Sequence, residues 1–307
     1  MRIRSHCTGH FPPIRFSEGK RYLMHPVSGK LLVDRPEERV RLRSIDYFLQ
    51  SNVWPAGRIA SEKSTTTKGK IHAGRIDLIL YDSALEPSVL IECKSPAVSI
   101  SAATARQIAR YNADIHAPTL CMTNGLVDYW YQVEQAEIIE LPGIPDGLRS
   151  EKPFVPDMNY WQSTGFAGKE TLMHFGLSDL LKVWFSGEAA MNLISLNPGL
   201  QQTVAGFYHY YQVVQEQGSP VKLAFTLLSS DGHDTILTFI RNVNGRNDAV
   251  LFLPLDAVYL GKEATVRLIR NSVDTAFSLP DHISQYLRES DDGYRSLPIF
   301  IDDLFTQ

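Results

Sequence analysis

Long hydrophobic runs are missing from this sequence of 307 residues. Its longest apolar runs, such as residues 249–253, are far shorter than the roughly 20 residues that a membrane helix needs. The N-terminal residues also lack the apolar core of a secretory signal peptide. We therefore expect a cytoplasmic protein that has no membrane partner.

Cysteine is scarce, and the usual phosphate-binding motif is absent. The three cysteines, Cys7, Cys93 and Cys121, form no Cys-x-x-Cys pair, so neither a disulfide framework nor a zinc ribbon is predicted. His6, Cys7 and His10 could form part of a metal site, but three ligands are few for one, and the simplest interpretation is a loose N-terminal arm. No Gly-x-x-x-x-Gly-Lys-[Ser/Thr] motif occurs, so ATP-driven machinery is not indicated.

The composition is that of a globular chain. Hydrophobic residues make up 44% and charged residues 21%, which is enough apolar material for a real core, and the length predicts about two domains. The charge is uneven: residues 1–150 contain 19 basic and 16 acidic side chains, whereas residues 151–307 contain 11 and 18. This distribution permits nucleic-acid contact in the first half only.

The first half alternates between strand-like and helical patterns. The patterns predict a hairpin over 20–34, helices over 36–51 and 101–115, and strands over 58–63, 75–81, 88–94, 119–123 and 127–133. A stretch rich in Ser, Thr, Lys and Gly separates the first two strands at residues 64–74. These elements predict a mixed α/β domain over residues 1–140, with the hairpin as an N-terminal arm.

The second half carries no catalytic pattern. Prolines interrupt residues 135–175, which we expect to be irregular, with a linker region at 141–175. Helices are predicted over 178–185 and from Asn197 to just before Gly218. Strands are predicted over 221–228, 235–241, 249–253 and 264–270, so residues 176–307 are expected to form a smaller, strand-rich α+β domain.

Two carboxylates and one ammonium are predicted to meet on the first sheet. Alternation places Glu92 and Lys94 on one face of their strand. If that strand forms a hairpin with the preceding one, pairing Leu80 with Val89 puts Asp77 directly opposite Glu92. The simplest alternative is a salt bridge on an exposed sheet face, with Lys94 between the two carboxylates.

This arrangement is suited to phosphodiester hydrolysis. Two neighbouring carboxylates repel each other, and a bound divalent cation removes the conflict. Oxygen ligands suit Mg²⁺, and the backbone carbonyl of Cys93 adds a further oxygen to those of Asp77 and Glu92. Lys94 would act on the attacking water or hold it in line with a phosphate.

Both predicted helices of the first half offer further candidates. Glu38 falls on the buried stripe of the first helix, which is an odd place for a carboxylate without a partner. On the second helix, Gln107 and Tyr111 are four residues apart and share one face, with Arg106 and Arg110 on adjoining faces. The alternative for the Gln–Tyr pair is simple packing.

Several short motifs occur in one order along residues 20–134. They are Arg35-Pro-Glu-Glu-Arg-Val-Arg41, Arg75-Ile-Asp77, Glu92-Cys-Lys-Ser-Pro96, Gln107-x-x-x-Tyr111 and Thr123-Asn-Gly125. The set resembles the PD-(D/E)xK nuclease superfamily, and in particular the N-terminal nuclease domain of type I restriction enzyme R (restriction) subunits. The resemblance implies a restriction-endonuclease-like fold, Mg²⁺-dependent DNA cleavage in which Mn²⁺ can substitute, and partners that include DNA and other restriction-modification subunits.

The resemblance also implies roles for individual residues. Asp77 and Glu92 would bind the metal, and Lys94 would act at the water. Gln107 and Tyr111 would support cleavage or DNA positioning. An acidic residue of the first helix would join the metal site; Glu38 is preferred because of its buried stripe, and Glu37 is held in reserve.

A lysine-rich segment leads directly into the Asp77 strand. Lys63, Lys68 and Lys70 stand among serines and threonines, close to the proposed site in sequence. They are candidates for DNA contact, together with Arg106 and Arg110 of the second predicted helix. The alternative is an ordinary solvated loop.

Two other functions compete with the nuclease. One is a catalytically silent nuclease-like fold that binds DNA or a restriction complex, and the presence of every expected catalytic residue type argues against it. The other is an RNA or protein interaction module acting through the C-terminal strands, where the acidic balance argues against direct phosphate contact. Type I R subunits continue into a translocase, whereas this sequence continues into a dissimilar region, so ATP-dependent restriction is not expected.

Overall fold

The computed structural model describes residues 3–18, 20–67, 70–135, 137–152, 154–169, 191–193, 210–214, 220–229, 234–260, 262–271, 273–282, 301 and 304–305. Internal contacts divide the chain into two units, one made of residues 1–12 and 23–154, the other of residues 13–22 and 155–307. Within the described part, no helix is long and apolar enough to cross a membrane.

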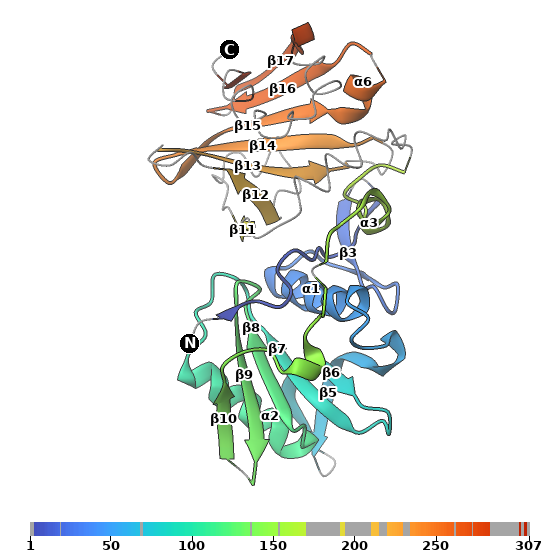
Figure 1. Ribbon diagram of the computed structural model, residues 1–307, viewed down its shortest axis with the longest axis vertical. Coiled ribbons are helices and arrows are strands. Elements are labelled where there is room, and N and C mark those ends of the chain that lie inside the picture. Colours follow the sequence, from blue (N-terminus) through green and yellow to red (C-terminus); the bar gives the residue numbers. More distant parts are fainter. Residues whose placement is uncertain are drawn as a thin grey trace. The chain divides into compact units, whose positions relative to one another are not determined.

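A mixed sheet of seven strands forms the centre of the first unit (Figure 1). Six strands follow the order β1-β9-β8-β7-β6-β5, and β10 pairs with β9. Their bounds are β1 (Ile3–Arg4), β5 (Ile59–Thr67), β6 (Lys70–Tyr81), β7 (Pro87–Cys93), β8 (Thr119–Thr123), β9 (Val127–Glu134) and β10 (Glu137–Leu141). Strands β7 and β8 are parallel, and the other pairs are antiparallel. The predicted mixed sheet with helices is confirmed.

Two helices pack on this sheet. Helix α1 (Pro36–Gln50) begins at a proline, whose fixed φ suits the first helical position, and has two acidic residues in its first turn. Helix α2 (Ala102–Ile115) buries Ile108 against Leu90 of β7 and Met122 of β8. Cys121 and Thr123 alternate with Met122, so they point to the opposite face of the sheet.

The N-terminal residues cover the polar side of α1, and the prediction of a loose arm is wrong. Cys7 and Phe11 are fully buried, and His10 is 3% exposed. His10 Nδ1 lies 2.8 Å from Asp46 Oδ2, and Arg43 Nε donates to the His10 carbonyl over 2.9 Å. The charged side of α1 therefore faces a hydrogen-bonded segment of the chain and not solvent.

The segments around the first hairpins hold more strand than predicted. The β3 (Lys20–Met24) and β4 (Leu31–Leu32) strands form the expected antiparallel hairpin, preceded by β2 (Ile14–Ser17). Residues 64–74 were expected to separate two strands, but β5 and β6 continue through most of them, with Thr66 opposite Ile71. Threonine and isoleucine are β-branched and favour extended backbone. Short 3₁₀ turns occur at Ala56–Arg58 and Asp146–Leu148.

The second unit contains an antiparallel sheet of seven strands in chain order, β11 to β17. Their bounds are β11 (Met191–Leu193), β12 (Tyr210–Val214), β13 (Val221–Leu228), β14 (Ile236–Val243), β15 (Arg246–Pro254), β16 (Thr265–Arg270) and β17 (Val273–Ser278). Two helices are described here, α3 (Met158–Thr164) and α6 (Leu255–Tyr259). The strand-rich character expected of this region is confirmed.

Some elements of the C-terminal half differ from the predictions. The helix expected to end before Gly218 is wrong at Tyr210–Val214, because those residues form β12 and Val213 pairs with Ala224 of β13. Residues 135–175 were expected to be irregular, yet they contain β10 and α3. In β12, strand pairing outweighs the local helix signals, because its tyrosines and valines favour extended backbone. The helix expected over 178–185 lies outside the described residues.

Candidate active site

The β6–β7 hairpin sets the position of the two predicted carboxylates. Leu80 pairs with Val89, and Leu78 pairs with Ile91. This is the register predicted from alternation, and it is confirmed. The next step along both strands places Asp77 opposite Glu92 on the face that α2 covers.

Hydrogen bonds hold the carboxylates and the lysine in place. Asp77 Oδ2 accepts from the backbone N–H of Cys93 over 2.8 Å, and Lys94 Nζ donates to Glu92 Oε1 over 2.6 Å. The Lys94 N–H donates to the Thr123 carbonyl over 2.8 Å, which extends the β7–β8 ladder beyond β7. The side chain of Glu92 is only 6% exposed and that of Lys94 19%. This ion pair is therefore mostly buried and does not lie on an open sheet surface.

Burial and charge shift the protonation of Glu92 and Lys94. Burial raises the pKa of Glu92 to about 7, with a further increase from the charge of Asp77, while Lys94 acts in the opposite direction. Burial by itself would lower the pKa of Lys94, but the hydrogen bond and the charge of Glu92 outweigh it, so the pKa of Lys94 is raised. The lysine is thus an ammonium group at neutral pH, and the charge of Asp77 repels the ionised form of Glu92.

We expect the stability of the cation-free protein to fall as pH rises toward neutrality. The pKa of Glu92 is about 7 in the fold against an ordinary value of 4.5, so the folded state holds its proton more tightly than the unfolded state does. That stabilisation is complete below about pH 4.5 and is lost as pH rises through about 7. Urea unfolding in EDTA at a series of pH values measures the slope.

Glu92→Gln is expected to remove most of this slope, because the amide does not titrate. Glu86→Gln is the matched control, since Glu86 is exposed in the β6–β7 turn of the same hairpin. Equal slopes in the wild type and in Glu92→Gln would show that Glu92 titrates normally.

Helix α1 adds Arg41 and Glu38 to the site. Arg41 Nη1 lies 3.7 Å from Asp77 Oδ1, and its Nη2 donates to Glu38 Oε2. The Arg41 side chain is 3% exposed and that of Glu38 18%, whereas Glu37 is exposed. Arg41 was not predicted as a site residue. The sequence did offer one indication of its role: Arg41 follows Glu38 by three residues, so the two side chains lie on the same side of the helix.

Helix α2 brings Tyr111 to the same side of the sheet. Tyr111 is half-buried against the apolar cluster beneath α2. It lies near enough to Lys94 that its ionisation would contribute to raising the pKa of Lys94, after the larger effects of burial, Glu92 and Asp77. Arg110 is exposed on this helix, and the side chains of Gln107 and Arg106 lie outside the described part of the structure.

The structure places the lysine-rich segment only in part. Lys63 is in β5 opposite Ile76, and Lys70 begins β6, but their side chains are not described. Lys68 lies outside the described residues. The described site therefore brings together the residues Glu38, Arg41, Asp77, Glu92, Lys94 and Tyr111.

The residues present fit a hard divalent cation. Asp77 and Glu92 offer carboxylate oxygens, which Mg²⁺ and Mn²⁺ prefer, and Cys93 offers a backbone carbonyl, while Glu38 is bonded to Arg41. The raised pKa of Glu92 shows that the positive groups of the site do not fully offset its burial and the charge of Asp77. A cation bound between the carboxylates would remove that conflict.

One comparison bears directly on this site. Residues 36–145 match the family model described as type I restriction enzyme R protein N terminus. The match spans α1 through β10 and contains every residue of the site named above, so the predicted resemblance is confirmed for this part of the chain. It supports a restriction-related, nuclease-like domain. A comparison with curated proteins gives no match.

Proposed function

We propose that the chain is a divalent-cation-dependent deoxyribonuclease that hydrolyses phosphodiester bonds in the restriction of foreign DNA. The observation that carries the proposal is the register of β6 and β7, which sets Asp77 opposite Glu92, with Lys94 bonded to Glu92 in a mostly buried patch. These residues lie inside the segment that matches the restriction-subunit family. DNA and other restriction-modification subunits are the partners of this proposal, and the cytoplasm is its location.

Asp77, Glu92 and Glu38, with the carbonyl of Cys93, would hold the cation. Mg²⁺ or Mn²⁺, when bound, supplies Lewis-acid polarisation of the phosphate and makes water a better nucleophile at neutral pH. The backbone N–H of Cys93 orients Asp77 by donating to its Oδ2. Arg41 links Glu38 to Asp77 and limits the negative charge that the site carries between turnovers.

Lys94 has a role that follows from its protonation state. Because its pKa is raised, Lys94 is a hydrogen-bond donor and not a general base at neutral pH. An ammonium beside Glu92 can hold the attacking water or a phosphate oxygen and offset the charge that develops on phosphate. Tyr111 and Gln107 on α2 would position the DNA backbone beside it.

A second candidate is a catalytically silent module that binds DNA or a restriction complex. Arg41 favours it, because its guanidinium already contacts Asp77 and Glu38 in place of a metal. The two functions differ in a simple measurement. Supercoiled plasmid incubated with the full chain is nicked in Mg²⁺ and intact in EDTA if the nuclease proposal holds. Plasmid that stays intact in both, while a gel shift shows binding, would favour the silent module.

The β5–β6 hairpin is proposed to contact DNA phosphates through Lys63, Lys68 and Lys70. Each lost phosphate contact should lower the log–log salt slope of DNA binding by about 1. A triple Lys→Ala protein is therefore expected to have a slope lower by up to about 3. Fluorescence anisotropy on a short duplex over a range of salt concentrations measures this change.

Lys30 is an exposed lysine of the β3–β4 hairpin, and Lys30→Ala is the matched charge control for that measurement. An unchanged slope in the triple variant would indicate that the lysines form an ordinary solvated surface.

A further inference from the structure

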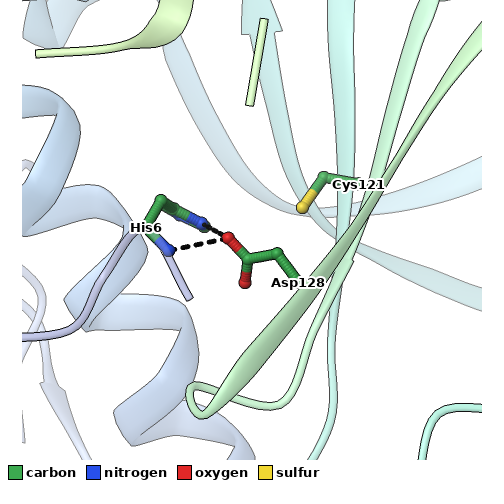
Figure 2. A group of neighbouring side chains, drawn as sticks. All are labelled: His6, Cys121 and Asp128. Carbon is green, nitrogen blue, oxygen red and sulfur yellow. Dashed lines mark hydrogen bonds and ion pairs between the residues drawn. The ribbon is translucent and has the colours of Figure 1, made fainter. Parts of the chain in front are cut away.

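A second cluster of metal-ligating side chains lies on the other face of the sheet. Asp128 of β9 pairs with Thr123 of β8, and Cys121 is two residues before Thr123, so all three share that face. His6 reaches them from the segment that follows β1. One ligand atom from each of His6, Cys121 and Asp128 lies within 4.8 Å of the others. Figure 2 shows these side chains converging, with the Cys121 sulfur turned toward the His6–Asp128 pair.

Polar atoms in this cluster are buried and lack a hydrogen-bond partner. The side chains of His6 and Asp128 are each 1% exposed, and Cys121 is fully buried. The backbone N and Nδ1 of His6 both lie against Asp128 Oδ2, at 2.7 and 2.6 Å. This leaves His6 Nε2 and Asp128 Oδ1 without a partner. Buried polar atoms nearly always have one, so these two atoms point to a missing ligand.

The scaffold holds the imidazole rigidly. Its ring centroid lies 5.1 Å from that of Tyr47, 5.5 Å from that of Phe48 and 5.6 Å from that of Trp130. Phe48 and Trp130 are fully buried. A histidine confined in this way has lost its rotamer freedom on folding, so a metal would bind it at little additional entropic cost.

We propose that His6, Cys121 and Asp128 bind a borderline transition-metal ion of the Zn²⁺ class. Imidazole nitrogen, thiolate sulfur and carboxylate oxygen are the three donor types of protein zinc sites, whereas Mg²⁺ is bound by oxygen alone. Met122, the register partner of Glu92, points to the opposite face from Cys121, so this site is separate from the carboxylates of the candidate active site. The ion would tie the N-terminal segment to β8 and β9.

The protonation of the ligands is compatible with this proposal. Burial opposes ionisation of Asp128, but the charge and hydrogen bonds of His6 outweigh it, so the pKa of Asp128 is lowered and the carboxylate is ready to bind. Burial raises the pKa of Cys121 well above its ordinary value, so binding must release the thiol proton, and affinity should rise with pH. Cys7, which is adjacent to His6 in the sequence, is a further buried free thiol.

Cobalt substitution tests the proposal on the whole chain of 307 residues. Metal-free protein titrated with Co²⁺ should develop the near-ultraviolet thiolate-to-metal charge-transfer band, saturating at about one ion per chain. Excess Zn²⁺ should remove the band, and excess Mg²⁺ should not. Oxygen ligands at Asp77 and Glu92 give no such band, so failure of the nuclease proposal would leave this result unchanged.

Matched cysteine variants locate the ion. Cys121→Ser should lose the band, while Cys93→Ser, which removes another buried cysteine of the same sheet, should keep it. Circular dichroism checks that both variants fold, and the Zn²⁺-dependent rise in Tm of the wild type gives a readout that needs no variant. A wild-type protein that shows neither the band nor the rise in Tm, or a band that persists in Cys121→Ser, would overturn the proposal.

Discussion

Lys94→Ala is expected to lower plasmid cleavage by about 10²–10⁴-fold, the usual effect of removing a positioned catalytic group. The ammonium of Lys94 is held 2.6 Å from Glu92, where it can donate to water or phosphate. Removing it leaves Asp77 and Glu92 in place, so divalent-cation binding should be kept or strengthened. Nicking rates and Mn²⁺ calorimetry on the same preparation measure the two effects together.

Lys94→Arg provides the sharper control. Arginine keeps the positive charge but replaces a compact ammonium with a planar fork, so a purely Coulombic role survives it better than the placement of a water molecule does. Loss of cleavage in Lys94→Arg with cation binding kept would assign Lys94 to water or phosphate placement. A Lys94→Ala protein that nicks plasmid at the wild-type rate would remove this residue from the mechanism.

Asp77→Asn is expected to abolish cleavage and to weaken Mn²⁺ binding strongly. The change removes a carboxylate that lies opposite Glu92, while the amide oxygen can still accept the Cys93 N–H. It also removes the charge that contributes to raising the pKa of Glu92, so the pH dependence of cation binding should move toward lower pH. Isothermal titration calorimetry at several pH values measures both changes.

Asp82→Asn is the matched control for Asp77→Asn. Asp82 lies in the turn of the same hairpin, where its carboxylate accepts from the N–H groups of Ala84 and Glu86. Mn²⁺ binding should be unchanged in this variant. Equal binding by wild type and Asp77→Asn would contradict the metal site, and residual nicking by Asp77→Asn would reveal a contaminating nuclease.

The central hairpin was predictable because a short turn joins its two apolar strands. The turn at residues 82–86 brings Leu80 opposite Val89, and the period of two along each strand then puts Asp77 and Glu92 on one face. The apolar residues at 78–80 and 89–91 are buried on both faces of the sheet, so they do not set the register by themselves. The Leu80–Val89 register, and with it the approach of Asp77 to Glu92, therefore followed from the turn and this period. The helices beginning near Pro36 and Ala102 were predictable from the periodicity of their apolar residues, and Pro36 suits the first position of α1.

Contacts between residues far apart in sequence were not predictable in this way. The spacing of Glu38 and Arg41 in the sequence places them on one side of a helix. Only the packing of α1 against β7 shows that Arg41 reaches Asp77. Asp46 is buried against His10, which lies 36 positions earlier in the sequence. A helix pattern states which residues share a face and carries no information on what covers that face.

The sequence by itself determined the mixed sheet, the β6–β7 register and the juxtaposition of Asp77, Glu92 and Lys94, because these depend on local periodicity and on pairing between neighbouring strands. Tertiary structure alone decided the placement of the N-terminal segment. It brings His6 to Asp128, which is 122 positions away, and so creates the second cluster. Such a contact depends on the surface that the folded sheet and α1 leave uncovered, and that surface exists only after both have packed.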